Sequence, residues 1–521
     1  MNLDFLLTMV KMEVRLRMRR LGTMIALLIV IGVTWAMVMR QSTGMSMMVV
    51  EHARTLYTSS TLALGSVTLS SSLLALIGFY LVRGRVVEDI RSGIGGVIAA
   101  TEVGNLQFLI ARWLGGVSYL GAIGLTVMLT MMVRHLIDGV GPLQPLIYLQ
   151  TYALILTPLI FFTVSCAILF DSFQVLMGKF GDVAYFFIFC GVLGAIGAAS
   201  EKMSSAGSPL LVLDFFGIGT TMLITKTLFH TNFVAVGGSN FNPALAPRVL
   251  PDMVWWTMPV LYRLTSACLA LLPLIPAVLR FHRFSPDRIK ASAGNKRRSP
   301  IAMLNQILRP LSFLVQPVFA LAIRTPGKAG EVFAELGLCL ISSPIAILSI
   351  IGLNIAALLI PGQQMPGVLI AAVTIWMILI SDMATRDYQA DSENMSGATA
   401  SGISGRYSRQ LATALLLGSL MMVGVASRGI ALGLLSLPAL LSGFFMLASV
   451  ATLLGRLTRT SRTFTVLSLF WVYVAVQIRN VPWVDVVGFN GVANSSTISF
   501  FTALGIGLTI SGYTYNHYRA R

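Results

Sequence analysis

The chain has 521 residues, of which only 11% are charged, against about 25% in an ordinary soluble domain. Hydrophobic residues make up 56% of the chain, more than a compact interior can hide from water. The composition therefore excludes a water-soluble fold and predicts an all-α polytopic membrane protein. The net charge of +17 comes from Lys and Arg placed between apolar runs, where they indicate membrane topology rather than a nucleic-acid partner.

Apolar runs that reach or approach the 20 or so residues of a bilayer crossing predict about twelve transmembrane helices in two groups of six. The first group covers residues 21–39, 62–82, 113–133, 146–170, 183–199 and 257–279. The second group covers residues 338–360, 366–381, 411–427, 430–454, 464–478 and 497–515. The halves look like a diverged duplication, because Pro158 and Pro438 hold corresponding places in the fourth and tenth runs, where matching kinks are expected.

The distribution of basic residues predicts the orientation of the chain. With a cytoplasmic N-terminus, 28 of the 37 Lys and Arg residues fall on the cytoplasmic side, where such residues are retained. Both termini are therefore expected in the cytoplasm. The chain divides into a first six-span unit (residues 1–280), a basic cytoplasmic linker (281–330) and a second six-span unit (331–521).

The outer connections of the two halves differ. Residues 200–256 form a large outer segment, whereas the equivalent connection in the second half, 479–496, is short. Within the larger segment, Asp214, Lys226 and two glycines interrupt the apolar stretch 210–229. These interruptions favour an interfacial or re-entrant hairpin over a complete crossing.

The sequence contains no pattern that would power transport by this chain alone. A phosphate-binding loop requires Gly-x-x-x-x-Gly-Lys followed by Ser or Thr, whereas the two Gly-Lys pairs, at residues 178–179 and 327–328, precede Phe and Ala. There is also no His-Glu-x-x-His pattern and no Cys/His cluster. We therefore expect no catalytic residue, metal site or cofactor in this chain.

Two features mark the predicted cytoplasmic edge of the first half. In residues 1–20, apolar side chains recur at three- and four-residue steps among Lys and Arg, which predicts an interfacial helix along the inner leaflet. The loop after the second span carries Glu88, Asp89 and Arg91, then a Gly-rich stretch and Glu102. This order predicts a short helix, a turn and a second helix, an arrangement that can seat in a groove of a partner.

These features resemble the type-2 permease subunits of ATP-binding-cassette (ABC) exporters. The resemblance rests on the N-terminal elbow helix with Glu13 and Arg15, on the Ala-Thr-x-x-x-Asn-x-x-x-Leu-x-x-Arg sequence leading into the third span, and on six spans with the longest outer loop between the fifth and sixth. It covers residues 1 to about 280 well and the second half more weakly. Thr101-Glu102 stands in place of the Thr-Pro usual in that family.

The resemblance implies an export channel in the bacterial cytoplasmic (inner) membrane, with two six-span units fused in one chain. Two copies of a separate cytoplasmic ATPase subunit, which bind ATP and Mg²⁺, would drive it. Loop residues of both halves would pass their motion to the spans: Glu88, Asp89, Arg91, Glu102, Arg386, Asp387, Asp391 and Glu393.

Polar residues within the spans are the candidates for a translocation pathway, because unpaired polar groups are costly in lipid. They are Ser71, Gln150, Ser165 and Asn354; hydrogen bonds between helices are sufficient to explain their presence without a substrate. No span carries a central Asp, Glu or His, so an apolar or amphipathic cargo is expected, such as a lipid, lipopeptide, peptide or drug-like molecule. An ion-gradient-driven secondary carrier of about twelve spans remains an alternative, as does a membrane scaffold or lipid-modifying enzyme.

Overall fold

The computed structural model describes residues 3–19, 21–38, 44–91, 93–173, 175–201, 208–231, 233–252, 254–281, 300–389, 392–393, 402–478 and 481–520. The chain forms two compact units, Met1–Arg297 (unit 1) and Arg298–Arg521 (unit 2). Each unit is described by itself.

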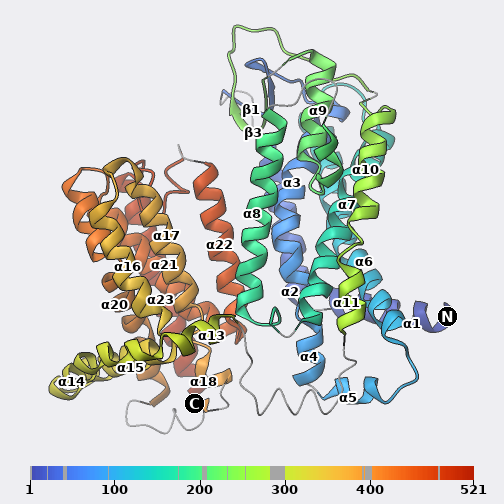
Figure 1. Ribbon diagram of the computed structural model, residues 1–521. Helices are drawn as coiled ribbons and strands as arrows, with labels where there is room; N and C mark the ends of the chain where they lie inside the picture. Colours follow the sequence, from blue (N-terminus) through green and yellow to red (C-terminus); the bar gives the residue numbers. More distant parts are fainter. Residues whose placement is uncertain are drawn as a thin grey trace. The chain divides into compact units, whose positions relative to one another are not determined.

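Unit 1 is a bundle of long apolar helices. Its main helices are α1 (Leu3–Met18), α2 (Leu21–Met37), α3 (Ser59–Val82), α6 (Asn105–Asp138), α7 (Pro145–Ser172), α8 (Lys179–Glu201) and α10 (Thr257–Leu269), which the seven-residue α11 (Leu274–Arg280) follows. Two short helices, α4 (Arg85–Arg91) and α5 (Ile94–Ala99), lie with α1 at one end of the unit, which we call the basal end (Figure 1). The opposite end is called apical.

A small antiparallel sheet at the apical end was not predicted from the sequence. Strands β1 (Met45–Val50), β2 (Ala53–Arg54) and β3 (Val234–Asn240) run in the order β2-β1-β3 beside helix α9 (Ile218–Phe229), which follows the short helix η2 (Pro209–Leu213) (Figure 1). The strand β1 has the sequence MSMMVV and is almost completely buried. Such a short, mostly apolar stretch lacks the alternation of apolar and polar residues that marks a half-buried strand. With 12 residues, α9 is about 18 Å long, too short to cross a hydrocarbon core of about 30 Å.

Unit 2 is a second helical bundle. Its elements are α13 (Pro300–Ile307), η3 (Arg309–Val315), α14 (Gln316–Arg324), α15 (Lys328–Ser342), α16 (Ile345–Leu359), η4 (Gly362–Gln364), α17 (Met365–Ile380), α18 (Arg386–Gln389), α20 (Gly402–Ala431), α21 (Leu437–Thr458), α22 (Ser461–Gln477) and α23 (Ser495–Ala520). Helices α14, α15 and α18 lie at one end of this unit, its basal end (Figure 1).

The long apolar helices are those of a multi-pass membrane protein. In the described part of the chain nine helical segments have the length and composition of a membrane span, or ten if the bent pair α15–α16 counts as one span. The predicted runs 21–39 and 464–478 coincide with α2 and α22, which have 17 residues each and fall short of the usual 20 or so. The expected number of twelve is therefore supported only in part.

The seventh predicted span, residues 338–360, is interrupted. Helices α15 and α16 meet at an angle of 97° across Ser343 and Pro344. Proline lacks the N–H that would continue the helix and disfavours helical geometry in the residue before it. The apolar run therefore contains the end of one helix and the whole of another, and α13, η3 and α14 occupy the described part of the predicted linker 281–330.

The two units share a pattern of helix packing. In unit 1, α1 and α2 both pack on α6, and α7 packs on α6, α10 and α11. In unit 2, α15 and α16 both pack on α20, and α21 packs on α20 and α23. One difference is that α3 packs extensively along α7, whereas α17 packs mainly on α20 and less on α21.

The expected matching kinks at Pro158 and Pro438 are not present. Pro158 lies inside α7, whereas Pro438 is the second residue of α21, in the first turn, where a helix does not need the missing N–H. By its place in the helix, Pro438 corresponds to Pro145, the first residue of α7.

Candidate functional site

The basal end of unit 1 contains a cluster of ion pairs centred on Glu13 of α1. The side chain of Glu13 is buried between α1 and α6, and Gly115 of α6 makes this approach possible. A Cβ atom at Gly115 would lie 2.5 Å from Cγ of Glu13, well inside van der Waals contact. The elbow helix therefore rests on the long helix through a buried carboxylate.

Two arginines from different helices bind this carboxylate. Oε1 of Glu13 accepts hydrogen bonds from Nε of Arg17, at 3.0 Å, and from Nε of Arg85 on α4, at 3.2 Å. Burial by itself raises the pKa of the Glu13 carboxyl, but the positive charges of Arg112, Arg17 and Arg85 outweigh it and the net pKa is lowered. Glu13 thus joins α1 to α4 as a charged group.

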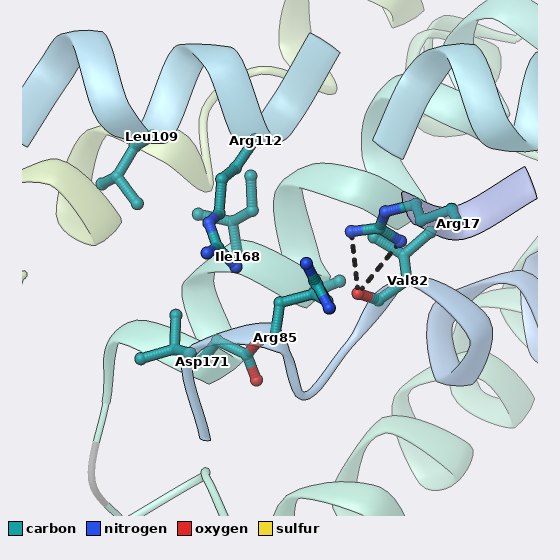
Figure 2. A pocket seen from close by; sticks show the side chains of 9 residues that line it. Arg17, Val82, Arg85, Leu109, Arg112, Ile168 and Asp171 are labelled. Atoms are coloured by element: carbon teal, nitrogen blue, oxygen red, sulfur yellow. Dashed lines mark hydrogen bonds between the residues drawn. The ribbon is translucent and has the colours of Figure 1, made fainter. Parts of the chain in front are cut away.

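Arg17 also caps the end of α3. Its two Nη atoms donate to the carbonyl oxygen of Val82, each at 3.4 Å (Figure 2). Val82 is the last residue of α3, where carbonyl groups lack a partner within the helix.

Helix α4 has one buried and one exposed acidic residue. Asp89 is buried and forms an ion pair with Arg112 of α6; burial raises the pKa of its carboxyl despite the neighbouring Arg112. Glu88 is half exposed and pairs with Arg85 at 2.7 Å. The helix therefore has one charge directed at α6 and another available at its surface.

The two residues between α3 and α4, Arg83 and Gly84, are bound to two further helices. Arg83, directly after α3, pairs with Asp182 of α8 and donates to the carbonyl oxygen of Gly178 at 3.2 Å. The backbone N–H of Gly84 donates to Oδ2 of Asp171, near the end of α7, at 2.8 Å. Helix α4 and the two residues before it are therefore bonded to α1, α6, α7 and α8, so that a rigid displacement of α4 would disturb contacts with all four helices.

Arg17, Arg85, Arg112 and Asp171 also line a small cavity (Figure 2). Its volume of about 20 Å³ has room for about one water molecule. The cavity is therefore too small to hold an organic ligand.

The basal end of unit 2 repeats the ion pair between a short helix and a long helix, and it has a further one between α15 and α20. On α15, Glu331 and Glu335 bind Arg409 of α20, at 3.0 and 2.5 Å. On the short helix α18, Asp387 binds the fully buried Arg406 of α20 at 3.1 Å. In each unit, a carboxylate of a short helix thus binds an arginine of the long helix that follows it: Asp89 binds Arg112, and Asp387 binds Arg406.

The remaining coupling candidates are placed as follows. Glu393 accepts from Arg406 and Arg456, each at 3.4 Å. Arg386 donates from Nη1 to the Sγ atom of Cys339 at 2.8 Å. Glu102 is exposed in the turn before α6. The side chain of Arg91, the last residue of α4, and all of Asp391 lie outside the described part of the structure.

The surroundings of the four pathway candidates are described one by one. Ser71 donates to the Thr68 carbonyl of its own helix at 2.8 Å, and Ser165 accepts from the Trp113 indole at 3.1 Å. Gln150 is exposed on α7. Asn354 joins α16 to α20, because it donates to the Leu420 carbonyl at 3.1 Å and accepts from the Gly424 N–H at 2.7 Å. Three of the four therefore form hydrogen bonds within the protein.

Sequence reasoning did not identify Glu331, Glu335 and Arg409 as part of the site. The two glutamates are four residues apart and so share one helical face, which was the available signal. The apolar run that follows them, residues 338–360, predicts a membrane span but gives no sign of a site at its start. Arg17 and Arg85 were not predicted as partners of Glu13 either; Arg85 lies 72 positions from Glu13 in the sequence.

No group of three or more His, Cys, Asp or Glu side chains in the described part of the chain is placed to hold a metal ion. No family model, curated protein or solved structure matches this chain. The site must therefore be interpreted from its own geometry.

We expect Glu13→Gln to destabilise unit 1 by about 2–3 kcal/mol at pH 7, because it leaves the buried guanidinium group of Arg17 without its carboxylate partner and Arg85 with Glu88 alone. Since the native pKa of Glu13 is lowered, its charged form stabilises the fold above the ordinary pKa of 4.5, and this contribution is lost as the pH falls through the native value. Thermal unfolding in detergent at pH 7 and below 4.5 should show the difference between variant and wild type shrinking with acid.

The control for this prediction is Glu88→Gln, because Glu88 also pairs with Arg85 but is half exposed. It should cost less than about 1 kcal/mol. Equal effects of the two variants, or a Glu13→Gln effect that grows with acidification, would contradict the assignment of Glu13 as the buried centre of the cluster.

Proposed function

We propose that this chain is the transmembrane subunit of an ABC exporter in the bacterial inner membrane. In this proposal its basal ends face the cytoplasm, and two copies of a separate ATPase subunit, which bind ATP and Mg²⁺, dock there. The chain itself carries no phosphate-binding loop, so the energy source is a partner. The resemblance of the first half to type-2 permease subunits supports this assignment.

The observation that carries the proposal is the same link in both units. A short helix between two spans presents a carboxylate to an arginine near the start of the following long helix: Asp89 to Arg112 in unit 1, and Asp387 to Arg406 in unit 2. An ion pair transmits motion from a peripheral helix to a span only if its side chains are fixed in position. Both arginines are buried, which fixes the end of each pair that lies on the span. Such a connection suits a permease moved by force applied from outside.

The surface of unit 1 next to this link suits a protein partner. Helix α5 exposes Ile94 and Val97, while Glu88 and Glu102 are exposed nearby in the sequence on either side of it. Apolar side chains bordered by charges are typical of protein interfaces. In the proposed complex these residues contact the ATPase, while Asp89 passes its motion inwards.

The cargo in this proposal is apolar or amphipathic. Ser71, Ser165 and Asn354 are bonded within the protein, which leaves them poorly suited to recognise a hydrophilic solute.

Arg91 and Asp391 are also proposed as coupling residues. Because the structure does not describe their side chains, this part of the proposal rests only on their positions in the sequence.

The test is to purify the chain with candidate cytoplasmic ATPases and measure complex formation and ATP hydrolysis. Val97→Asp should reduce co-purification about ten-fold or more, as expected for an interface residue worth over 1.4 kcal/mol, and Glu88→Ala and Glu102→Ala should reduce it less. Glu51→Ala, an exposed residue beside the apical sheet, is the matched control. Transport by the isolated chain under a proton gradient, with no ATPase present, would instead establish the secondary carrier.

A further inference from the structure

An open apolar pocket lies at the apical end of α8 in unit 1. One wall is a single face of α8, and the other is η2 with the residues that follow it. The volume of the pocket is about 220 Å³. Its lining residues are Val192, Ala195, Ile196, Ala199, Ser200, Ser208, Leu210, Leu211, Leu213, Asp214 and Phe215.

The polar side chains of the pocket are already bonded to the protein. Ser200 donates to the Gly197 carbonyl at 2.8 Å, and Ser208 accepts from the Leu210 N–H at 3.3 Å. The carboxylate of Asp214 accepts from the backbone N–H groups of Gly217 and Thr220, at 2.9 and 2.7 Å. The pocket therefore offers contact area but no strong hydrogen-bonding group to a ligand.

The location of the pocket determines which apolar molecule reaches it. Helix α8 is a candidate membrane span, and Phe187 and Ile188 on it are exposed, as expected for side chains that face lipid. The rim residues Leu210 and Leu213 are also more than half exposed. Acyl chains surround such a surface at far higher concentration than any other apolar molecule.

The size of the pocket fits part of such a chain. An apolar protein cavity of about 150 Å³ stays dry and binds benzene, a ring of six carbons. The larger volume here accommodates a hydrocarbon segment of more than six carbons. We propose that this pocket binds one acyl chain of a membrane phospholipid, inserted between α8 and η2 in the apical half of the bilayer.

The test uses purified full-length chain in phospholipid vesicles containing phosphatidylethanolamine with a photoactivatable diazirine near the end of one acyl chain. After irradiation, labelled peptides are mapped by mass spectrometry. Label is expected on both walls, residues 192–200 and 208–215. Ala199→Phe fills the pocket and should lower labelling of the η2 wall about ten-fold, which corresponds to about 1.4 kcal/mol.

The matched control is Ala198→Phe, because Ala198 is the neighbouring exposed residue and is absent from the pocket lining. It should leave labelling of the η2 wall unchanged, and labelling near Phe187 should be the same in both variants. Ala195→Leu at the mouth gives a milder reduction and replaces Ala199→Phe if that variant unfolds. Equal labelling of the η2 wall in pocket and control variants would overturn the proposal. The assay contains no ATPase, so its failure is separate from failure of the proposed function.

Discussion

Replacing Arg263 with methionine is expected to destabilise unit 1 by about 3–5 kcal/mol, because it removes one member of a buried ion pair. Arg263 of α10 and Asp214 are both almost completely buried. The guanidinium group donates to the carbonyl oxygens of Ile155 and Phe215, at 2.9 and 3.2 Å. Arg263 thereby joins α10 both to α7 and to the segment Asp214–Phe215. Thermal or denaturant unfolding in detergent measures the loss.

The same side chain compensates for Pro158. Since proline has no N–H, the carbonyl of Leu154, four residues earlier, lacks its usual partner in α7. Nε of Arg263 donates to this carbonyl at 3.1 Å. In Pro158→Ala the new N–H of residue 158 can take over, so the double variant should lose about 1 kcal/mol less than the sum of the two single changes.

The control for Arg263 is Arg248→Met. Arg248 pairs with Glu51 at 2.8 Å, but both side chains are nearly half exposed, so the loss should stay below about 1 kcal/mol. A similar cost for both arginines would contradict the importance of burying the Arg263 ion pair. Strictly additive effects of Pro158→Ala and Arg263→Met would show that the Leu154 carbonyl does not depend on Arg263.

Local sequence patterns predicted most of the helices and failed where distant residues determine the structure. The apolar runs located α3, α6, α7, α8 and α21 because a bilayer requires length and hydrophobicity within one segment. Strand β1 could not be recognised in the same way, since its partner β3 begins at Val234, far along the chain. In the run 338–360, composition outweighed Pro344, which marks the break between α15 and α16.

In the candidate site, too, local sequence predicted the position of the residues but not their partners. Glu88 and Asp89 were predicted together, yet only Asp89 is buried. It shares a helical face with Val86, three residues before it, which is also buried, and this spacing was available in the sequence. The pairing of Asp89 with Arg112 was not, because two carboxylates and several arginines in this region allow many combinations that only the packing of α4 on its neighbours resolves.

Asp89→Asn is expected to separate docking from transmission. In the proposed exporter, Glu88 lies at the surface and Asp89 faces α6, so Asp89→Asn should keep the ATPase bound but lower ATP-driven transport. Allosteric coupling typically involves about 1–3 kcal/mol, or roughly 5- to 150-fold, and the loss should fall in this range. Transport and co-purification are measured on the same preparations.

The charge exchange Asp89→Arg with Arg112→Asp provides the decisive comparison. It restores an attractive pair between α4 and α6 in reversed order, so it should recover part of the transport that either single reversal abolishes, whereas Asp387→Arg with Arg406→Asp tests the same link in unit 2. A general loss of folding would affect the double variants at least as strongly as the single ones. If neither exchange recovers transport while the proteins remain folded and ATPase-bound, then the motion does not pass through these ion pairs, and the repeated link serves the stability of each bundle alone.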